Sequence, residues 1–412
     1  MQLSGKRLLF LGGADIQVPA IKKAQELGAW VITCDYLPDN PGHKVSNEYH
    51  NVSTTDKEKV LSLAETLKID GISAYASDPA ALTAAYVSEK MGLPGNSYAA
   101  VAELADKVTF RKLQARLGIP SPRLIETADP EMVLQEVKNF RHGAIIKPVD
   151  TSGSKGIYRI LPGETETEVL LKINDALSFS RVKKVVLEEF LKRKDFLMSG
   201  DFMIDKGKIV FYCFGDVHFN DAITGLVPRS ISLPASNQNP EFFARVIADL
   251  QKMLDALHIR TGVFNCDVIE DEEGRAVVID IGARNGGNLF NDIISLHTGE
   301  DLIGQTILQT LGYPVSIRQP QSHKGYFAHN VIHSMADGIF KAVIFHPEIE
   351  KCIFYRMINV KEGDPVKRFI HSGNRLGLVL LKFESFGQMH RMLGNIYEYV
   401  RVEVAAQARL ID

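Results

Sequence analysis

GVFNCDVIEDEEGRAVVIDIGARNGGN, at residues 262–288, is the stretch that decides the fold, because it has the pattern of a β-hairpin. Two apolar runs, Val263–Ile269 and Ala276–Ile281, flank a short polar turn. Each run carries one carboxylate at a position where an apolar residue is expected, Asp267 in the first and Asp280 in the second. The pattern therefore predicts two acidic side chains on neighbouring strands.

The register of the hairpin determines whether these two acids meet. We expect Glu270 to pair with Arg275 across the turn. In that register Asp267 faces Val278, and Asp280 lies diagonally from Asp267 on the same face. Two carboxylates on one buried face repel each other and are costly to desolvate unless a cation joins them. Mg²⁺ fits this role, because proteins hold it with one or two carboxylates plus substrate phosphates.

Arg284 and the glycine-rich run 285–288 follow the point where the second strand ends. An arginine among glycines at a strand end is well placed for an anionic ligand. The hairpin alone favours the simpler alternative equally, namely an aspartate that hydrogen-bonds at a strand edge and a solvated arginine.

The composition excludes several broad classes of protein. A chain of 412 residues predicts two to four domains at roughly 100–200 residues each. The net charge of −3 gives no electrostatic case for a nucleic-acid or anionic-membrane partner. The four cysteines form no CxxC pair, so neither zinc nor a disulfide framework is indicated. No signal peptide and no apolar run of the ~20 residues that span a bilayer is visible, so we expect a soluble cytoplasmic protein.

Residues 1–97 alternate short apolar runs with helical patterns, which predicts a doubly wound parallel sheet with helices on both faces. The expected helices are Pro19–Leu27, Lys57–Leu67 and Pro79–Met91. Gly12 and Gly13 partly match a dinucleotide-binding fingerprint, but the third glycine of GxGxxG is absent. A tight turn with ordinary packing is the favoured interpretation of these glycines.

Residues 98–122 have the pattern of a helical connector, with one helix from Val101 to Leu117 that Gly118 and Pro120 end. A small α+β unit follows at residues 123–187. The strand HGAIIKPVD places Lys147 inside an apolar run, where an amine is costly unless it meets an anion or reaches water.

The segment TSGSKG, residues 151–156, follows this strand. Small residues let backbone N–H groups approach a phosphate, and Lys155 adds positive charge. The segment is not a Walker motif, and a Ser/Gly turn alone is more often only a turn. The strand lysine that precedes it favours a phosphate site.

Residues 188–325 carry a larger sheet, and residues 326–412 have the pattern of a small α+β cap. VVLEEFL at residues 185–191 is expected to join the small unit to the larger sheet. Further expected elements are a hairpin at 201–216, helices at Pro240–Leu257, Ile293–Leu296, Asp301–Leu311 and Ser385–Asn395, and a strand in RLGLVLLKFES.

Taken in order, these motifs resemble the ATP-grasp superfamily of carboxylate–amine and carboxylate–thiol ligases. That superfamily includes biotin carboxylase, the carbamoyl-phosphate synthetase large chain, purine-biosynthesis ligases and L-amino-acid ligases. The motifs are ADKVTFRKLQARLGIPSPR, AIIKPVDTSGSKGI, VVLEEFL with GDFMI, GVFNCDV and VVIDIGARNGG. They cover residues 1–312, and the C-terminal part matches loosely. The resemblance implies an ATP-grasp fold, in which a two-part ATP-binding region follows the N-terminal α/β domain.

The resemblance implies roles for the residues around the nucleotide. Lys107 and Lys147 would reach the phosphates, and a flexible loop would close over them. The loop residues are Ser152, Gly153, Ser154, Lys155 and Gly156. Glu188 would accept from the adenine amino group. The backbone of Glu189 and Leu191 would meet the adenine edge, and Asp201 would bind the ribose hydroxyls.

The resemblance also implies that Asp267 and Asp280 hold one or two Mg²⁺ ions, with Mn²⁺ as a substitute, and that Arg284 meets the acyl phosphate or substrate carboxylate. The family usually has Glu or Gln at the first metal position and Glu at the second, whereas both are Asp here. The usual asparagine two residues after the second acid is Gly282, which puts the second ion in doubt.

The activity implied is an ADP-forming C–N ligase that joins a small-molecule carboxylate to an amine through an acyl phosphate. Three alternatives stay open. They are a carboxylase or phosphotransferase with the same site, a nucleotide-binding regulatory protein that Gly282 favours, and an NAD-dependent enzyme that uses residues 1–97. Nucleic acid and membrane are not expected as partners, and homodimers are common among the relatives.

Overall fold

The N-terminal region forms a four-stranded parallel sheet with helices on both faces, as the sequence predicts. The computed structural model describes residues 2–149, 156–220 and 226–406. The strand order is β3-β2-β1-β4, and every pair is parallel. The strands are β1 Arg7–Leu11, β2 Trp30–Cys34, β3 Glu48–His50 and β4 Gly71–Ser73. The helices are α1 Val18–Glu26, α2 Pro41–Val45, α3 Lys57–Leu67 and α4 Asp78–Met91.

The connector contains two helices, α5 Tyr98–Ala105 and α6 Lys107–Arg116, where the sequence predicted one. Asp106 separates them, because its backbone is extended (φ −86°, ψ 119°) and its carboxylate caps α6 by accepting from the Val108 and Thr109 amides. This cap places Lys107 at the first turn of α6.

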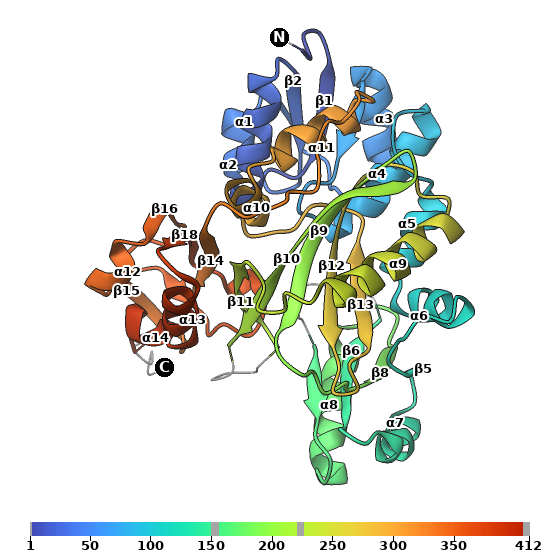
Figure 1. The fold of residues 1–412 in the computed structure, drawn as a ribbon, viewed down its shortest axis with the longest axis vertical. Coiled ribbons are helices and arrows are strands. Elements are labelled where there is room, and N and C mark those ends of the chain that lie inside the picture. Colours follow the sequence, from blue (N-terminus) through green and yellow to red (C-terminus); the bar gives the residue numbers. More distant parts are fainter. Residues whose placement is uncertain (1, 150–155, 221–225, 407–412) are drawn as a thin grey trace, which may run out of the picture.

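A small antiparallel sheet lies below the connector (Figure 1). Its order is β5-β8-β6-β7, with β5 Leu124–Thr127, β6 Ala144–Pro148, β7 Tyr158–Ile160 and β8 Val185–Glu189. Helices α7 Pro130–Glu136 and α8 Glu166–Phe179 contribute apolar side chains to its core. Strand β8 pairs with β5 and β6 inside the small sheet, and the chain directly after it leads to the main sheet, where Arg193 forms a bridge with Asp271 in the β12–β13 turn.

The main sheet has eight strands in the order β13-β12-β9-β10-β11-β14-β18-β16. They are β9 Leu197–Asp205, β10 Lys208–Phe219, β11 Pro228–Leu233, β12 Gly262–Glu270, β13 Ala276–Gly282, β14 Tyr326–Ile332, β16 Ile353–Ile358 and β18 Gly377–Phe383. Helix α9, Pro240–Ala256, packs through Phe242 and Val246 in one core with Phe264. Helix α10, Phe290–Thr298, packs in another core with Met203 and Val263.

The C-terminal part does not stand apart from this sheet, since β14, β18 and β16 extend it beyond β11. The remaining strands, β15 Gly338–Phe345, β17 Pro365–Val366 and β19 Val400–Ala405, form a three-stranded sheet of their own. The helices of this part are α12 Pro347–Glu350, α13 Phe386–Gly394 and α14 Ile396–Tyr399. Helix α11, Leu302–Thr310, returns to the N-terminal sheet, where Ile303 and Ile307 pack with Leu8 and Phe10 (Figure 1).

The described part of the chain contains no helix that combines the length and the apolar composition needed to cross a membrane.

Candidate active site

The two acids of the hairpin lie directly opposite each other. Asp267 on β12 pairs with Asp280 on β13. The predicted register was wrong for two reasons. Glu270 pairs with Ala276 instead of Arg275, and the register then shifts by one residue between Asp267 and Val268. Ile279 is the extra residue of this β-bulge, a feature that the alternation of apolar and polar residues does not reveal.

The two carboxylates have different surroundings. Asp267 is half-buried and Asp280 is exposed. Burial raises the pKa of Asp267 to about 6, and the charge of Asp280 adds to this, against a hydrogen bond from Ser199 and the charge of Arg284. A carboxylate that is costly to ionise and faces a second carboxylate fits a divalent cation.

Two protein carboxylates leave most coordination positions of such an ion to phosphate oxygens and water. No group of three or more His, Cys, Asp or Glu residues suited to a metal ion occurs within residues 2–149, 156–220 and 226–406. The donor set therefore fits Mg²⁺ bound together with a nucleotide better than a site built from protein ligands alone.

Lys147 on β6 forms an ion pair with Glu188 on β8. Glu188 also accepts from Arg111 Nε at 2.7 Å. Burial alone would raise the pKa of Glu188, but the charges of Lys147 and Arg111 outweigh it and hold the pKa at about 2. This carboxylate is only 4% exposed and both of its oxygens have cationic partners, and the adenine role of Glu188 stays a prediction.

Arg111 is a site residue that the sequence reasoning missed. Its Nη1 donates to Gln114 Oε1 at 2.7 Å and its Nη2 donates to the Ile279 carbonyl at 2.6 Å. Arg111 therefore contacts α6, β8 and β13 at once. It stands four residues after Lys107, so both lie on one face of α6, a signal that the sequence did contain.

Lys107 lies among the same charges. Its pKa is lowered by burial and by the charge of Lys147, while Asp280 and Glu188 act in the opposite direction. Lys107 and Lys147, next to the acids Asp280 and Glu188, form a mixed-charge cluster, which a polyanion such as a nucleotide phosphate would complete.

Arg284 is largely buried, and its guanidinium is paired with an acid of the protein. Its side chain is 15% exposed and forms a two-pronged ion pair with Asp78, from Nε to Oδ1 at 2.6 Å and from Nη2 to Oδ2 at 2.8 Å. Its Nη1 donates to the Asn285 carbonyl at 3.1 Å. Burial opposes the charge of Arg284, yet Asp78 keeps its pKa raised.

Asp78 was also missed by the sequence reasoning. It is the first residue of α4, just beyond the carboxyl end of parallel strand β4. The carboxyl ends of parallel strands are the usual places for ligand-binding groups, so its position was a usable signal.

Asp201, for which the ribose role stays a prediction, has its hydrogen-bond partners within the protein. It is fully buried, and its carboxylate accepts from the side-chain amides of Asn265 and Asn291 and from the backbone amide of Gly286, each at 2.8 Å. Gly286 must lack a side chain here, because a Cβ would lie 2.9 Å from Asp201 Oδ1. Asp201 therefore fixes the backbone of the glycine-rich run through the Gly286 amide.

Four residues of the expected phosphate loop, Ser152, Gly153, Ser154 and Lys155, lie outside the described residues. Gly156 closes the loop in the left-handed conformation (φ +66°), which favours glycine. Of the adenine-edge residues, Glu189 donates its amide to the Arg123 carbonyl at 2.9 Å. The amide of Leu191, just past β8, makes no hydrogen bond within the described part of the chain.

Three non-glycine residues near Asp78 or Arg284 in the sequence have left-handed backbones. Ala76, Asn288 and Leu289 have φ values of 56°, 52° and 59°. Ala76 lies two residues before Asp78, and the other two join the glycine-rich run to α10. Left-handed conformations of non-glycine residues are costly and cluster at ligand sites.

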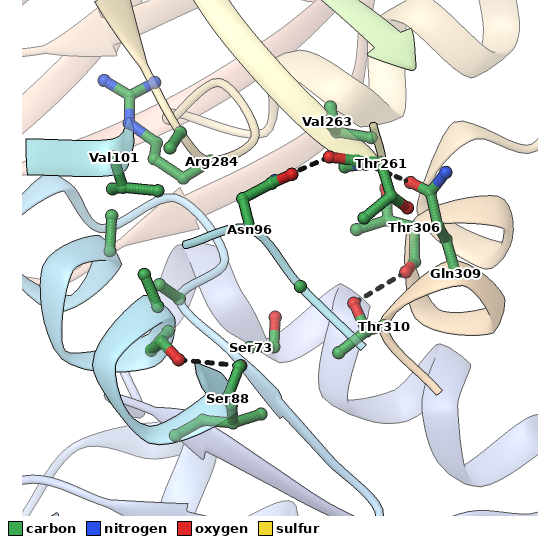
Figure 2. A pocket seen from close by; sticks show the side chains of 18 of the residues that line it. Ser73, Ser88, Asn96, Val101, Thr261, Val263, Arg284, Thr306, Gln309 and Thr310 are labelled. Atoms are coloured by element: carbon green, nitrogen blue, oxygen red, sulfur yellow. Dashed lines mark hydrogen bonds between the residues drawn. The ribbon is translucent and has the colours of Figure 1, made fainter. Parts of the chain in front are cut away.

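A cavity of about 110 Å³ lies behind Arg284, between the N-terminal sheet and β12. Figure 2 shows Arg284 at its edge, with the guanidinium directed away from Asn96 and Gln309. Its polar lining is largely paired within the protein, for example Asn96 with the Thr261 carbonyl at 2.7 Å and Gln309 with the Gly262 amide at 2.9 Å. Because neither Asp267 nor Asp280 lines it, this cavity is not where the charged groups converge.

Comparison with known proteins gives the fold a family context. No family model matches the chain. Formate-dependent phosphoribosylglycinamide formyltransferase of Burkholderia mallei is 26% identical over 254 residues, which is 60% of this chain and 55% of that protein. The corresponding protein of Paraburkholderia xenovorans is 24% identical over the same extent. The chain thus spans about half the length of the curated relatives it matches.

Solved structures match nearly the whole chain. An L-amino acid ligase from Bacillus licheniformis has a TM-score of 0.80 at 17% identity, covering 98% of this chain and 99% of that one. Phosphoribosylglycinamide synthetase from Anaerococcus prevotii has a TM-score of 0.73 at 18% identity, covering 97% and 100%. The biotin carboxylase domain of Hydrogenobacter thermophilus 2-oxoglutarate carboxylase, solved as a dimer with MgADP and bicarbonate, has a TM-score of 0.74 at 14% identity, covering 97% and 91%. These matches confirm the ATP-grasp fold.

Proposed function

We propose that this chain, which has the ATP-grasp fold, is an ATP-dependent carboxylate–amine ligase that releases ADP. The observation that carries the proposal is the pairing of Asp267 directly opposite Asp280, within reach of the charges of Lys107 and Arg284. An isolated pair of acids on a sheet would be a burden to the fold, whereas a pair beside cations is suited to a metal–phosphate ligand.

In this proposal the nucleotide lies between the small sheet and the main sheet. Lys147 and Lys107 receive its phosphates, and Glu188 with Arg111 fixes the position of Lys147. The backbone after β8, from Glu189 to Leu191, meets the adenine edge. The loop Ser152–Gly156, with Lys155, covers the phosphates and excludes water. Asp267 and Asp280 would hold Mg²⁺, which would supply positive charge next to the phosphates. We propose one ion, or two ions with the second bound more weakly because Gly282 stands in place of an asparagine. Mn²⁺ would substitute for Mg²⁺.

The proposed reaction has two steps. An oxygen of the substrate carboxylate attacks the γ-phosphorus of ATP, the bond to the β-phosphate oxygen breaks, and ADP leaves. The amine nitrogen then attacks the acyl carbon, loses a proton and releases inorganic phosphate. The residues contribute mainly by placing the reactants and by neutralising charge on the transferring oxygens. We assign Arg284 to the acyl phosphate or the substrate carboxylate, because its planar fork suits either group; in the structure the fork is paired with Asp78, which the ligand would have to replace.

The names of the similar proteins support the same chemistry. Formate and amino acids are carboxylates, and they appear in the names of the formate-dependent formyltransferase and the L-amino acid ligase. These names belong to those proteins, and the substrates of this chain remain to be found by experiment.

The test is ADP formation over a panel of carboxylates and amines that includes formate, bicarbonate and amino-acid pairs, with Asp280→Asn as the control of strongly reduced activity. Formation of ADP and phosphate that depends on both a carboxylate and an amine supports the proposal. Dependence on bicarbonate alone would favour a carboxylase. Release of AMP and pyrophosphate, or tight ATP binding without turnover on any pair, would contradict the ligase.

A further inference from the structure

The outer edge of the main sheet is held from outside by helix α6. The edge strand is β13, and the carbonyl groups at its bulge point to the connector instead of to β12. Gln114 Nε2 donates to the Val278 carbonyl at 2.8 Å, and Arg111 Nη2 donates to the Ile279 carbonyl at 2.6 Å. Gln114 is fully buried and Arg111 is 7% exposed, so water does not compete for these bonds.

The bulge determines which face Asp280 occupies. Val268 pairs with Val278 before the bulge. If that register continued without an extra residue, Asp267 would face Ile279, and Asp280 would lie opposite Cys266. Because alternate residues of a strand point to opposite faces, Asp280 would then lie on the face of the sheet away from Asp267. The extra residue at Ile279 is therefore required for the two acids to meet.

We propose that Arg111 and Gln114 are positioning residues that hold the bulge at Ile279 and thereby keep Asp280 opposite Asp267. This inference rests on the proposed function, in which the two acids bind a divalent cation. Arg111 also binds Glu188, the ion-pair partner of Lys147. The Arg111 side chain therefore connects Lys147 of the small sheet to the bulge at Ile279 in the β12–β13 hairpin.

A simpler role for the same contacts would be to cover the free edge of β13. Edge strands present unpaired carbonyl groups, and a neighbouring helix commonly shields them. The two roles predict different results. Loss of an edge cover lowers stability only, whereas loss of a positioning residue also changes the affinity for the metal ion.

The decisive variant is Gln114→Leu, and the chain offers a matched control in Gln309→Leu. Gln309 is 7% exposed, donates to the Ile204 carbonyl at 2.6 Å and accepts from the Gly262 amide at 2.9 Å. It thus makes the same kind of contacts to the other end of β9 and β12, away from the bulge. We expect thermal melting to show a comparable loss of stability for both variants.

The first readout is ATP affinity measured by calorimetry over a series of Mg²⁺ concentrations. Loss of a group that orients a metal ligand typically weakens metal affinity about 10- to 100-fold. We expect Gln114→Leu to raise the half-maximal Mg²⁺ concentration by about tenfold or more on that scale. ATP affinity without Mg²⁺ stays at the wild-type value, and Gln309→Leu keeps the wild-type Mg²⁺ curve.

The second readout is a crystal structure of the Gln114→Leu protein, which needs no nucleotide. A β13 register in which Ile279 faces Asp267 supports the inference, and an intact bulge with a wild-type Mg²⁺ curve overturns it. If the ATP affinity of the wild type does not depend on Mg²⁺, the two acids do not bind the cation and that part of the proposed function fails. The crystal structure alone then decides whether Arg111 and Gln114 set the register of β13. If Gln114→Leu does not fold, Arg111→Lys keeps the charge beside Glu188 without the fork, and we expect the same Mg²⁺ shift.

Discussion

Two aspartates on neighbouring strands of the main sheet show how differently one residue type can be used. Asp201 on β9 and Asp267 on β12 lie two positions apart along the same pair of strands. Asp201 is fully buried and accepts three hydrogen bonds from uncharged amides. Asp267 is half-buried, has Ser199 as its hydrogen-bond donor and faces a second carboxylate. The satisfied acid holds the fold together, and the unsatisfied acid is suited to a ligand.

Asp280→Asn should have the largest effect on activity and little effect on the fold. Asp280 is exposed and the substitution keeps its size, but it removes one of the two charges proposed to hold the cation. Loss of one such group typically costs roughly 10²–10³ in rate. ADP formation at saturating ATP measures this, and higher Mg²⁺ should restore part of the activity. Wild-type turnover in both Asp280→Asn and Asp267→Asn would show that the opposed acids are not a metal site.

Asp201→Ala should produce the reverse pattern. Removal of the carboxylate leaves the amides of Asn265, Asn291 and Gly286 buried without their acceptor. We expect the free energy of unfolding to fall by about 3 kcal/mol or more, since three buried donors lose their acceptor and each costs about 1–3 kcal/mol. Denaturant unfolding measures the loss, and calorimetry on the folded protein should give near-normal ATP affinity. Weaker ATP binding with unchanged stability would support the ribose role of Asp201.

Asp267 should also show itself in the dependence of stability on pH. Burial raises the pKa of Asp267 from 3.8 to about 6 in the folded protein. The folded state therefore binds a proton more tightly than the unfolded state, and this contribution to stability is present below pH ~4 and lost as pH rises through ~6. It amounts to at most about 3 kcal/mol.

The measurement compares wild type with Asp267→Asn, because other groups titrate in the same range. Without metal, the stability of the wild type relative to the variant should fall as pH rises from about 4 to about 6. Mg²⁺, added together with ATP, should reduce this fall, because the bound cation stabilises the ionised pair of carboxylates. A flat difference without metal would mean that Asp267 ionises at its ordinary pKa.

Much of the architecture could be predicted from the sequence because it follows from local patterns. Helix α3 has the expected limits, and α4 begins one residue early at Asp78. The strands β12 and β13 lie within a residue of the predicted runs. Periodicity, caps and turn residues act over a few positions, so a single sequence contains them.

The site required information that no local pattern carries. The bulge at Ile279 is held by side chains of α6 more than 160 positions earlier in the chain. Asp78 and Arg284 are 206 positions apart. Glu188 and Asp201 were assigned to ATP by resemblance, whereas their hydrogen-bond partners occupy them within the protein. Whether an acid is satisfied depends on these distant partners, and only the folded chain brings them together.

Arg284→Lys should have the smallest effect of the set and bears on the substrate side of the site. Lysine keeps the charge but cannot form two parallel hydrogen bonds to one carboxylate. If Arg284 binds the substrate carboxylate as proposed, the KM for that carboxylate should rise by about tenfold. This factor corresponds to the loss of one charge-assisted hydrogen bond that contributes about 1.5 kcal/mol. ATP affinity should stay near normal, because the two hydrogen bonds of the Arg284 fork go to Asp78 and lysine keeps the positive charge. Steady-state kinetics with the carboxylate varied at saturating ATP gives the result.

Arg275→Lys is the matched control, since Arg275 lies on the same hairpin, pairs with Asp271 at 2.7 Å and is 51% exposed. Equal carboxylate kinetics in wild type and both variants would leave Arg284 with a single role, that of joining β13 to α4 through Asp78.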